Sequence, residues 1–171
     1  MKCRFGSLKM QNLDNIQALW AREMPQLDTS TMALIGRLQI AHKHMTLAMS
    51  KTFRRYGLSE AGFDVLATLR RSGPPYRLTP NQLLAQMLVT SGSMTSRLNQ
   101  LQKQQLITRS QDQQDKRICW VQLTEQGLAL SKEVIQAHVE TQQALLAGLS
   151  REQHQQLLSG LQAYLQQAGL E

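Results

Sequence analysis

The chain has 171 residues, of which 42% are hydrophobic, 5% aromatic and 18% charged, and its formal net charge is +7. This length allows one substantial core, and the aliphatic composition favours helices. No apolar run reaches the roughly 18 residues of a membrane-spanning helix, and residues 1–10 lack the apolar segment of a signal peptide. The excess of positive charge favours a polyanionic partner, a nucleic acid or an anionic membrane surface, with general solubility as the alternative.

Three helices are predicted in the first part of the chain. The first covers residues 13–23 and is ended by Pro25. The second is capped at residue 29 or 30 and reaches about residue 55, because apolar side chains recur there at spacings of three and four. The third begins after its cap, Ser59, and ends before the turn at 72–75.

A helix-turn-helix is predicted next. Thr79 is suited to cap a helix, Pro80 to occupy its first position and Gln82 to complete a capping box. A short turn at 88–90 and a second helix at 91–104 follow. Two short helices joined by a tight turn are typical of a DNA-binding motif.

A β-wing is predicted after the helix-turn-helix. Residues 106–109 and 118–123 are the only segments with convincing strand character, and the loop between them is polar and charged. Two strands joined by a charged loop in this position make a wing. The predicted fold class is mainly α with a small β-wing: a winged helix-turn-helix with N- and C-terminal dimerisation helices.

Two more helices are predicted in the C-terminal part, one capped by Thr124 and one that begins with a capping box at 150–153. The apolar sides of residues 32–53 and 157–165 have no partner domain in this chain. A second copy of the chain is the simplest cover, which predicts a homodimer.

The second helix of the helix-turn-helix has the two faces that DNA recognition needs. Met94, Leu98 and Leu101 recur at spacings of four and three, so they can pack against the domain. No acidic residue that would repel phosphate occurs from 78 to 111. The candidate DNA contacts on this helix are Ser91, Ser93, Thr95, Ser96 and Arg97. The alternative is an ordinary solvent-exposed face with serines near the helix start.

The charged loop of the predicted wing favours DNA contact over this alternative. Lys116 and Arg117 lie at the hairpin tip, where they could enter a minor groove or bind phosphates. Asp115 is better placed to orient Arg117 than to contact DNA. A basic wing directly after a helix-turn-helix favours double-stranded DNA as the partner.

In sequence, the chain resembles the MarR family of bacterial transcriptional regulators over about residues 31–127. The resemblance includes a first wing strand of the form L-I/V-x-R, a D-x-R tip and an L-T-x-x-G exit from the wing. The segments that carry it are 56–59 (YGLS), 78–80 (LTP), 91–98 (SGSMTSRL), 106–109 (LITR), 115–117 (DKR) and 123–127 (LTEQG).

This resemblance implies a homodimer whose two winged-helix lobes bind a pseudo-palindromic operator. It also implies repression that is relieved by a small anionic or aromatic ligand. On this reading, residues 1–171 form one MarR-like domain. It has N-terminal and dimerisation helices at 1–55, a DNA-binding lobe at 56–124 and C-terminal dimerisation helices at 125–171.

The chain also resembles the urate-responsive subgroup of this family, which carries an extra N-terminal helix with a tryptophan. This resemblance implies that Trp20 stacks on the ligand, that Asp64 hydrogen-bonds its N–H groups and that Arg71 offers positive charge to a urate-like anion. Arg109 would link the pocket to the DNA-reading lobe. A planar anion suits an aromatic face and an arginine fork.

Each of these four residues has a structural alternative. Trp20 could fill a gap in the core. Asp64 and Arg71, which are two turns apart on one side of a helix, could form a structural ion pair or lie apart on the surface. Arg109 could contact only a phosphate.

Three other functional classes remain as alternatives. An enzyme is not expected, because the sequence has no Gly-rich phosphate loop, no nucleophile elbow and no metal-ligand spacing. A thiol-based redox regulator would use Cys3, whereas Cys119 lies in a predicted strand, where cysteine packs as a small hydrophobe. A non-specific architectural DNA-binding protein would share the basic charge. Two cysteines make no disulfide framework, so we expect a reduced, cytoplasmic protein without a cofactor.

Overall fold

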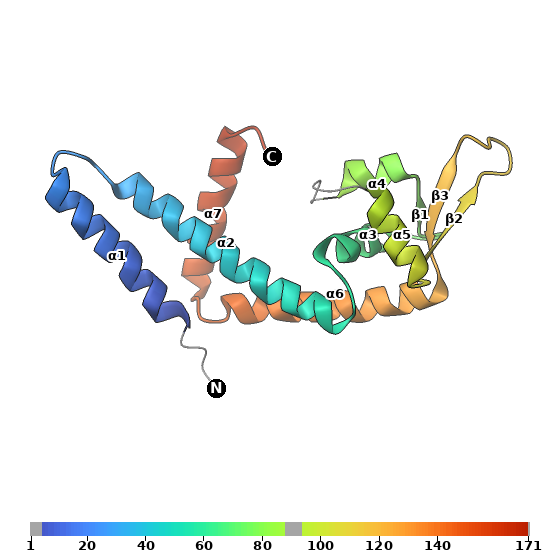
Figure 1. Cartoon of the computed structure of the whole chain (residues 1–171), viewed down its shortest axis with the longest axis horizontal. Coiled ribbons are helices and arrows are strands. Elements are labelled where there is room, and N and C mark those ends of the chain that lie inside the picture. The colour runs from blue at the N-terminus through green and yellow to red at the C-terminus, as the bar shows by residue number, and fades with distance from the viewer. Residues whose placement is uncertain (1–4, 88–93, 171) are drawn as a thin grey trace. The chain divides into compact units, whose positions relative to one another are not determined.

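The computed structural model describes residues 5–87 and 94–170, and these residues are mainly helical (Figure 1). The helices are α1 (Phe5–Glu23), α2 (Ser30–Arg55), α3 (Glu60–Arg71), α4 (Pro80–Gln86), α5 (Met94–Lys103), α6 (Glu125–Leu146) and α7 (Arg151–Gln167), and the strands are β1 (Arg77–Leu78), β2 (Ile107–Gln111) and β3 (Cys119–Leu123). The predicted class, mainly α with a small β-wing, is confirmed. Within the described ranges, none of the helices is long and apolar enough to cross a membrane.

The chain divides into two compact units, one up to Leu47 and one from Ala48 onward. The first unit pairs α1 with the first part of α2 (Figure 1). Arg37 Nη2 lies 2.8 Å from Asp14 Oδ1 and forms an ion pair between the two helices. Helix α1 begins at Phe5, earlier than the predicted start at residue 13, because a nucleated helix extends readily through residues that include no proline.

Many large apolar side chains of the first unit are exposed. Its buried side chains include Ala33, and Trp20 is half-buried. The exposed set is Ile16, Leu19, Met24, Leu27, Met32, Leu34, Ile35, Leu38, Met45 and Leu47. A surface of this composition is typical of a helix that packs against another protein.

The core of the second unit lies among α3, α4, α5, α6 and the strands. The fully buried apolar side chains there are Val65, Leu66, Leu69, Leu83, Leu101, Ile107, Val121 and Val134. Arg70 reaches from α3 to α6, where its Nη1 donates to the carbonyl oxygen of Leu128 (2.7 Å) and to Ser131 Oγ (3.1 Å). This contact fixes α3 against α6.

Side-chain caps begin four helices of this unit at the residues that the sequence predicted. Ser59 Oγ accepts a hydrogen bond from the Gly62 amide (3.0 Å) at the start of α3. Before α4, Thr79 and Gln82 exchange side-chain to backbone hydrogen bonds of 2.9 and 3.2 Å. Thr124 caps α6, and the predicted capping box precedes α7. These four predictions are confirmed.

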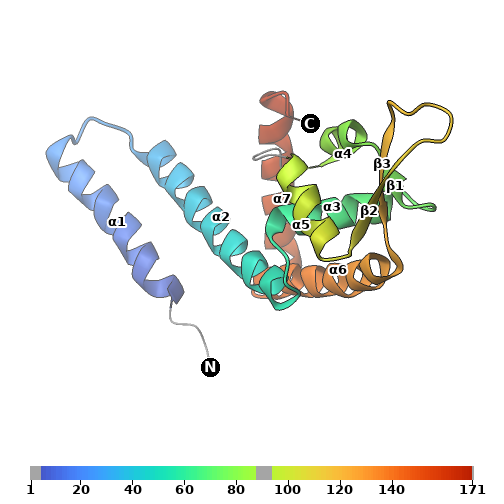
Figure 2. The ribbon, with the colours of Figure 1, turned by 45° about the vertical axis from the view of Figure 1, so that its right-hand side comes forward.

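The strands form an antiparallel sheet in the order β1-β3-β2. Strands β2 and β3 make the predicted wing, and its loop extends away from the helices of the same unit in both views (Figures 1 and 2). The expectation of only two strands was wrong, because β1 lies on the other side of β3. With two residues, β1 is too short to show an alternating pattern, and only its pairing with β3 makes it a strand.

Candidate nucleic-acid interface

The recognition-helix candidate α5 has the two faces that the sequence predicted. Leu98 and Leu101 are each only 2% exposed, and Met94 packs against the same core. The side chains of Thr95 and Ser96 are exposed at the start of the helix. Among the other candidates, Ser91 and Ser93 lie outside the described residues. The described part of α5 therefore presents short polar groups on the side opposite its core contacts.

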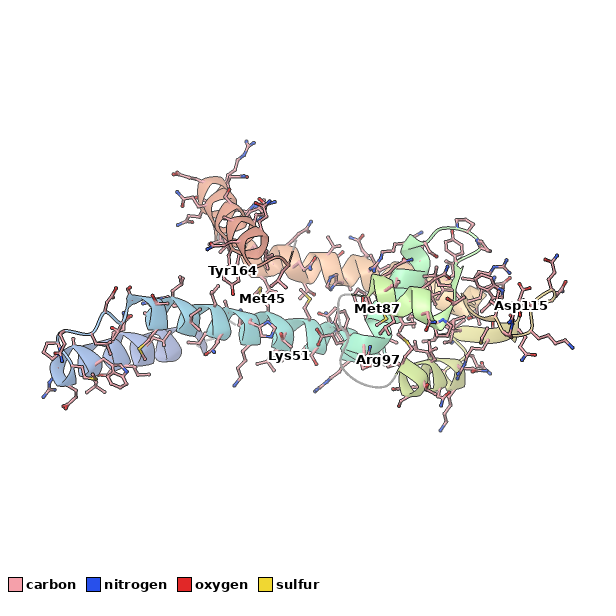
Figure 3. All side chains as sticks on the ribbon, turned by 90° about the horizontal axis from the view of Figure 1, so that it is seen from above. Met45, Lys51, Met87, Arg97, Asp115 and Tyr164 are labelled. Atoms are coloured by element: carbon pink, nitrogen blue, oxygen red, sulfur yellow. The ribbon has the colours of Figure 1, made fainter. Side chains whose placement is uncertain are left out.

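Arg97 occupies a different position on α5 from its exposed neighbours. It is half-buried and lines a shallow pocket with Ser59, Gly62 and Gln104, between the start of α3 and α5. Figure 3 shows Arg97 on the helical part of the unit, with Asp115 on the projecting wing. The contact of Arg97 with DNA stays a prediction, and its position would also let it fix α5 against α3.

The wing loop holds the predicted basic pair together with its acidic neighbour. Asp115 Oδ1 accepts hydrogen bonds from the amide and Nε of Arg117, and its Oδ2 accepts one from Nη2, all at 3.0 Å. Because of these bonds, the pKa of Asp115 is lowered and that of Arg117 is raised. The Arg117 side chain is nevertheless 91% exposed, and Lys116 beside it is exposed too. Both cations are therefore accessible to a polyanion.

A second carboxylate, Asp112, organises the start of the same loop, and the sequence analysis missed it. Its Oδ1 accepts the backbone amides of Gln114 (2.8 Å) and Asp115 (3.1 Å), and its Oδ2 accepts the indole Nε1–H of Trp120 (2.9 Å). These bonds, that of Trp120 foremost, lower the pKa of Asp112. An aspartate at the first position of a polar loop is itself a signal for such a turn.

Arg109 connects the wing to α5. From β2, its Nε donates to Gln102 Oε1 (2.7 Å) and its Nη2 donates to Asn99 Oδ1, both on α5. This arrangement makes Arg109 a link between the two elements that would read DNA. Neither amide partner had been singled out from the sequence, because amide side chains on a polar helix face carry no distinctive pattern.

The remaining ligand candidates occupy different environments. Asp64 is buried on α3, with 7% of its surface exposed. Arg71, at the end of the same helix, is exposed and donates from Nη2 to the backbone oxygen of Gln86 in α4. Trp20 lies half-buried on α1, in the first unit. The ligand roles of these residues stay predictions.

Groups that could carry other chemistry are few in the described residues. In residues 5–87 and 94–170, no three His, Cys, Asp or Glu side chains gather at a distance suited to a metal ion. His138 stacks on Phe53 and lies tilted against Phe63, with ring centroids 5.6 and 4.7 Å away, as expected for a packing residue. Cys119 is half-buried in β3, and Cys3 lies outside the described residues.

Comparison with known sequences points to one family. Residues 56–118 match the model of the MarR family. The HTH-type transcriptional regulator PecS of Dickeya dadantii (strain 3937) is 36% identical over 141 residues, which are 82% of this chain and 85% of PecS. The HTH-type transcriptional regulator MhqR of Bacillus subtilis (strain 168) is 27% identical over 116 residues, 68% of this chain and 78% of MhqR.

Solved structures share the fold. A mutant of MarR from E. coli complexed with operator DNA superposes with a TM-score of 0.65 at 23% identity, covering 86% of this chain and 98% of that one. Bordetella bronchiseptica BpsR, whose DNA binding is described as regulated by 6-hydroxynicotinic acid, gives a TM-score of 0.63 at 22% identity, covering 74% and 89%. At these identities the likeness establishes the winged-helix fold.

Proposed function

Because this chain belongs to the MarR family and is therefore a DNA-binding transcriptional regulator rather than an enzyme, we propose that it is a repressor. It binds a pseudo-palindromic operator as a homodimer, and a small aromatic anion such as urate releases it. The observation that carries this proposal is the link through Arg109 between the polar face of α5 and a wing with two accessible cations.

Helix α5 supplies the major-groove contacts. Its buried leucines hold it on the core, so Thr95 and Ser96 face outward at its start. Ser91 and Ser93 remain candidates for the same contacts from the sequence alone. Short hydroxyl side chains at a helix start suit phosphate and base-edge contacts. Arg97 adds a longer cationic group for a phosphate or a guanine edge.

The wing supplies the second contact. Lys116 and Arg117 lie on an exposed loop of the β2–β3 hairpin, and Asp115 restrains the Arg117 guanidinium through a bidentate contact. A restrained cation loses less conformational entropy when it binds a phosphate or enters a minor groove. Contacts from both the wing and α5 fix the position and orientation of the protein along the duplex.

The dimer is supported by exposed apolar side chains in each unit. On α7, Leu157, Leu158, Leu161 and Tyr164 are between 40% and 61% exposed, and the helix has no buried residue. In the first unit, a comparable set of leucine, isoleucine and methionine side chains is exposed on α2. A second copy of the chain is the occupant that a palindromic site requires.

Ligand release would act through the arginines. Arg71 and Arg109 are both held by neutral oxygens, those of Gln86 for the first and of Asn99 and Gln102 for the second. An anionic ligand offers a stronger, charge-assisted partner to an arginine. A ligand that draws Arg109 away would break the link between β2 and α5 and so loosen the DNA-reading surface. Trp20 would stack on the ligand, and Asp64 would accept hydrogen bonds from the N–H groups of the ligand.

The first experiment is a gel-shift titration on the DNA upstream of the protein's own gene, with excess competitor DNA, with and without urate. We expect a competitor-resistant complex that urate dissociates. A complex that survives urate contradicts the urate assignment and leaves the regulator intact. A complex lost to competitor contradicts sequence-specific binding at that site.

Two sets of variants separate DNA contact from ligand contact. Lys116→Ala should weaken the complex and lower the slope of log affinity against log salt by about one, because one phosphate contact is lost. Lys132→Ala, on the exposed surface of α6, is the matched control and should change neither. Trp20→Phe and Arg71→Gln should bind the operator but need more urate for release. An unaltered urate response in both would remove them from the ligand site.

A further inference from the structure

The outer face of the wing sheet carries a connected set of side chains. Ile107 on β2 and Val121 on β3 are buried in the core, so Trp120, the residue before Val121 on β3, points to the other face. Arg77 on β1 reaches the same face, where its Cζ lies 4.6 Å from the centroid of the Trp120 ring. This is a cation–π contact between the edge strand and the central strand of the sheet.

The Trp120 indole also holds the wing loop. Its Nε1–H donates to Asp112 Oδ2 at 2.9 Å. The second oxygen of the same carboxylate accepts the backbone amides of Gln114 and Asp115. These two amides belong to the stretch of backbone that leads directly into the DNA-contact candidates of the wing. Asp112 therefore holds the backbone of the loop in place, and Trp120 holds Asp112 against the sheet.

From this geometry, we infer that Arg77, Trp120 and Asp112 form a wing anchor that positions the loop for DNA. Trp120 is a positioning residue: it sets operator affinity through Asp112, without contacting the DNA itself. The physical reason is entropic, because a loop that is already ordered loses less freedom when it binds. The inference rests on the proposed contact of the wing with DNA.

The test is a double-mutant cycle on operator affinity at fixed salt, built from Trp120→Phe and Lys116→Ala. Phenylalanine keeps an aromatic ring on the sheet but removes the Nε1–H donor. We expect Trp120→Phe alone to weaken operator binding about tenfold, because a loop without this hydrogen bond has to be ordered when the DNA binds. In this background Lys116→Ala should add little further loss, because the lysine is no longer held in position.

Two additional variants keep the test decisive. Arg77→Gln removes the stacked cation from an exposed position. This variant should therefore fold even if Trp120→Phe does not. It should also weaken binding, with the same reduced effect of Lys116→Ala. Thr108→Ala changes an exposed side chain of β2 and serves as the control.

The outcomes separate this inference from the proposed function. The anchor is overturned if Trp120→Phe weakens operator binding less than about twofold. It is also overturned if the loss of affinity in the double variant equals the product of the two single losses to within about twofold. If Lys116→Ala does not weaken operator binding in the otherwise unchanged protein, the proposed contact of the wing with DNA is contradicted, and the anchor with it. A cost of Lys116→Ala that shrinks sharply in the Trp120→Phe background supports both.

Discussion

Gly127 lies so close to Leu106 that a Cβ added to the glycine would come 1.9 Å from the Leu106 carbonyl oxygen. The same oxygen accepts the Thr124 amide at 3.1 Å. Thr124 Oγ1 donates to the Gln105 carbonyl (2.7 Å) and accepts the Gly127 amide (2.9 Å). The exit of the wing, the start of α6 and the end of the α5–β2 turn therefore meet at one point, which explains the glycine of the L-T-x-x-G pattern.

Gly127→Ala should destabilise the protein by about 3 kcal/mol, because the added methyl group meets backbone that cannot move aside. The measurement is urea unfolding at a fixed protein concentration. Gly148→Ala is the matched control, since an added Cβ there has nothing within 4 Å, and it should stay within about 0.5 kcal/mol of the parent. A Gly127→Ala variant as stable as this control would mean that α6 can move away from β2 at little cost.

Arg70→Met should cost about 1.5–3 kcal/mol of unfolding free energy, the range for hydrogen bonds to a charged group in a partly buried site. It removes the donors to Leu128 and to Ser131, whose side chain is fully buried. Arg54→Met, at the exposed end of α2, should cost no more than about 0.5 kcal/mol. Equal losses in the two variants would show that the Arg70 contact adds nothing specific.

Asp115→Ala should reduce the preference of the protein for its operator over competitor DNA by about fivefold, within the range of exposed ion pairs. The Arg117 guanidinium loses its bidentate partner, so specific binding weakens. Non-specific affinity should not fall, because a negative charge leaves a surface that faces phosphate. Competition titrations measure both quantities, and a parallel fall of both would contradict an orienting role for Asp115.

The stability of the protein should decrease as the pH falls below about 6.5, the ordinary pKa of histidine. Burial lowers the pKa of His138, whose ring packs against those of Phe53 and Phe63. Above the ordinary pKa both states are neutral at this residue, and stability does not depend on it. Below it the unfolded chain binds the proton first, so stability is lost until the pH reaches the lowered pKa of the folded state.

Urea midpoints at about pH 7.5 and about pH 5.5 test this expectation. His138→Phe keeps the aromatic stack and should reduce the difference between the two midpoints. His154→Gln changes an exposed histidine on α7 and should leave it as in the parent. A difference that is the same in all three proteins would assign the pH dependence to other groups.

Local sequence signals determined most of the helical framework. The caps at Ser59, Thr79, Thr124 and Ser150 all start helices where predicted, because a cap satisfies backbone amides within three residues of itself and needs no distant partner. The spacing of Leu98 and Leu101 likewise identified the buried side of α5, since helical periodicity alone places them on one face. The charged wing followed from composition and from its place after the helix-turn-helix.

Only the tertiary structure decided how these elements hold one another. Strand β1 exists because Arg77 and Leu78 pair with β3, and the same pairing brings Arg77 onto Trp120. The partners of Arg70 lie 58 and 61 residues away in sequence, and Arg109 finds its amide partners on another element. No local pattern encodes such pairs, because a polar side chain looks the same in sequence whether it faces water or a partner that folding brings to it.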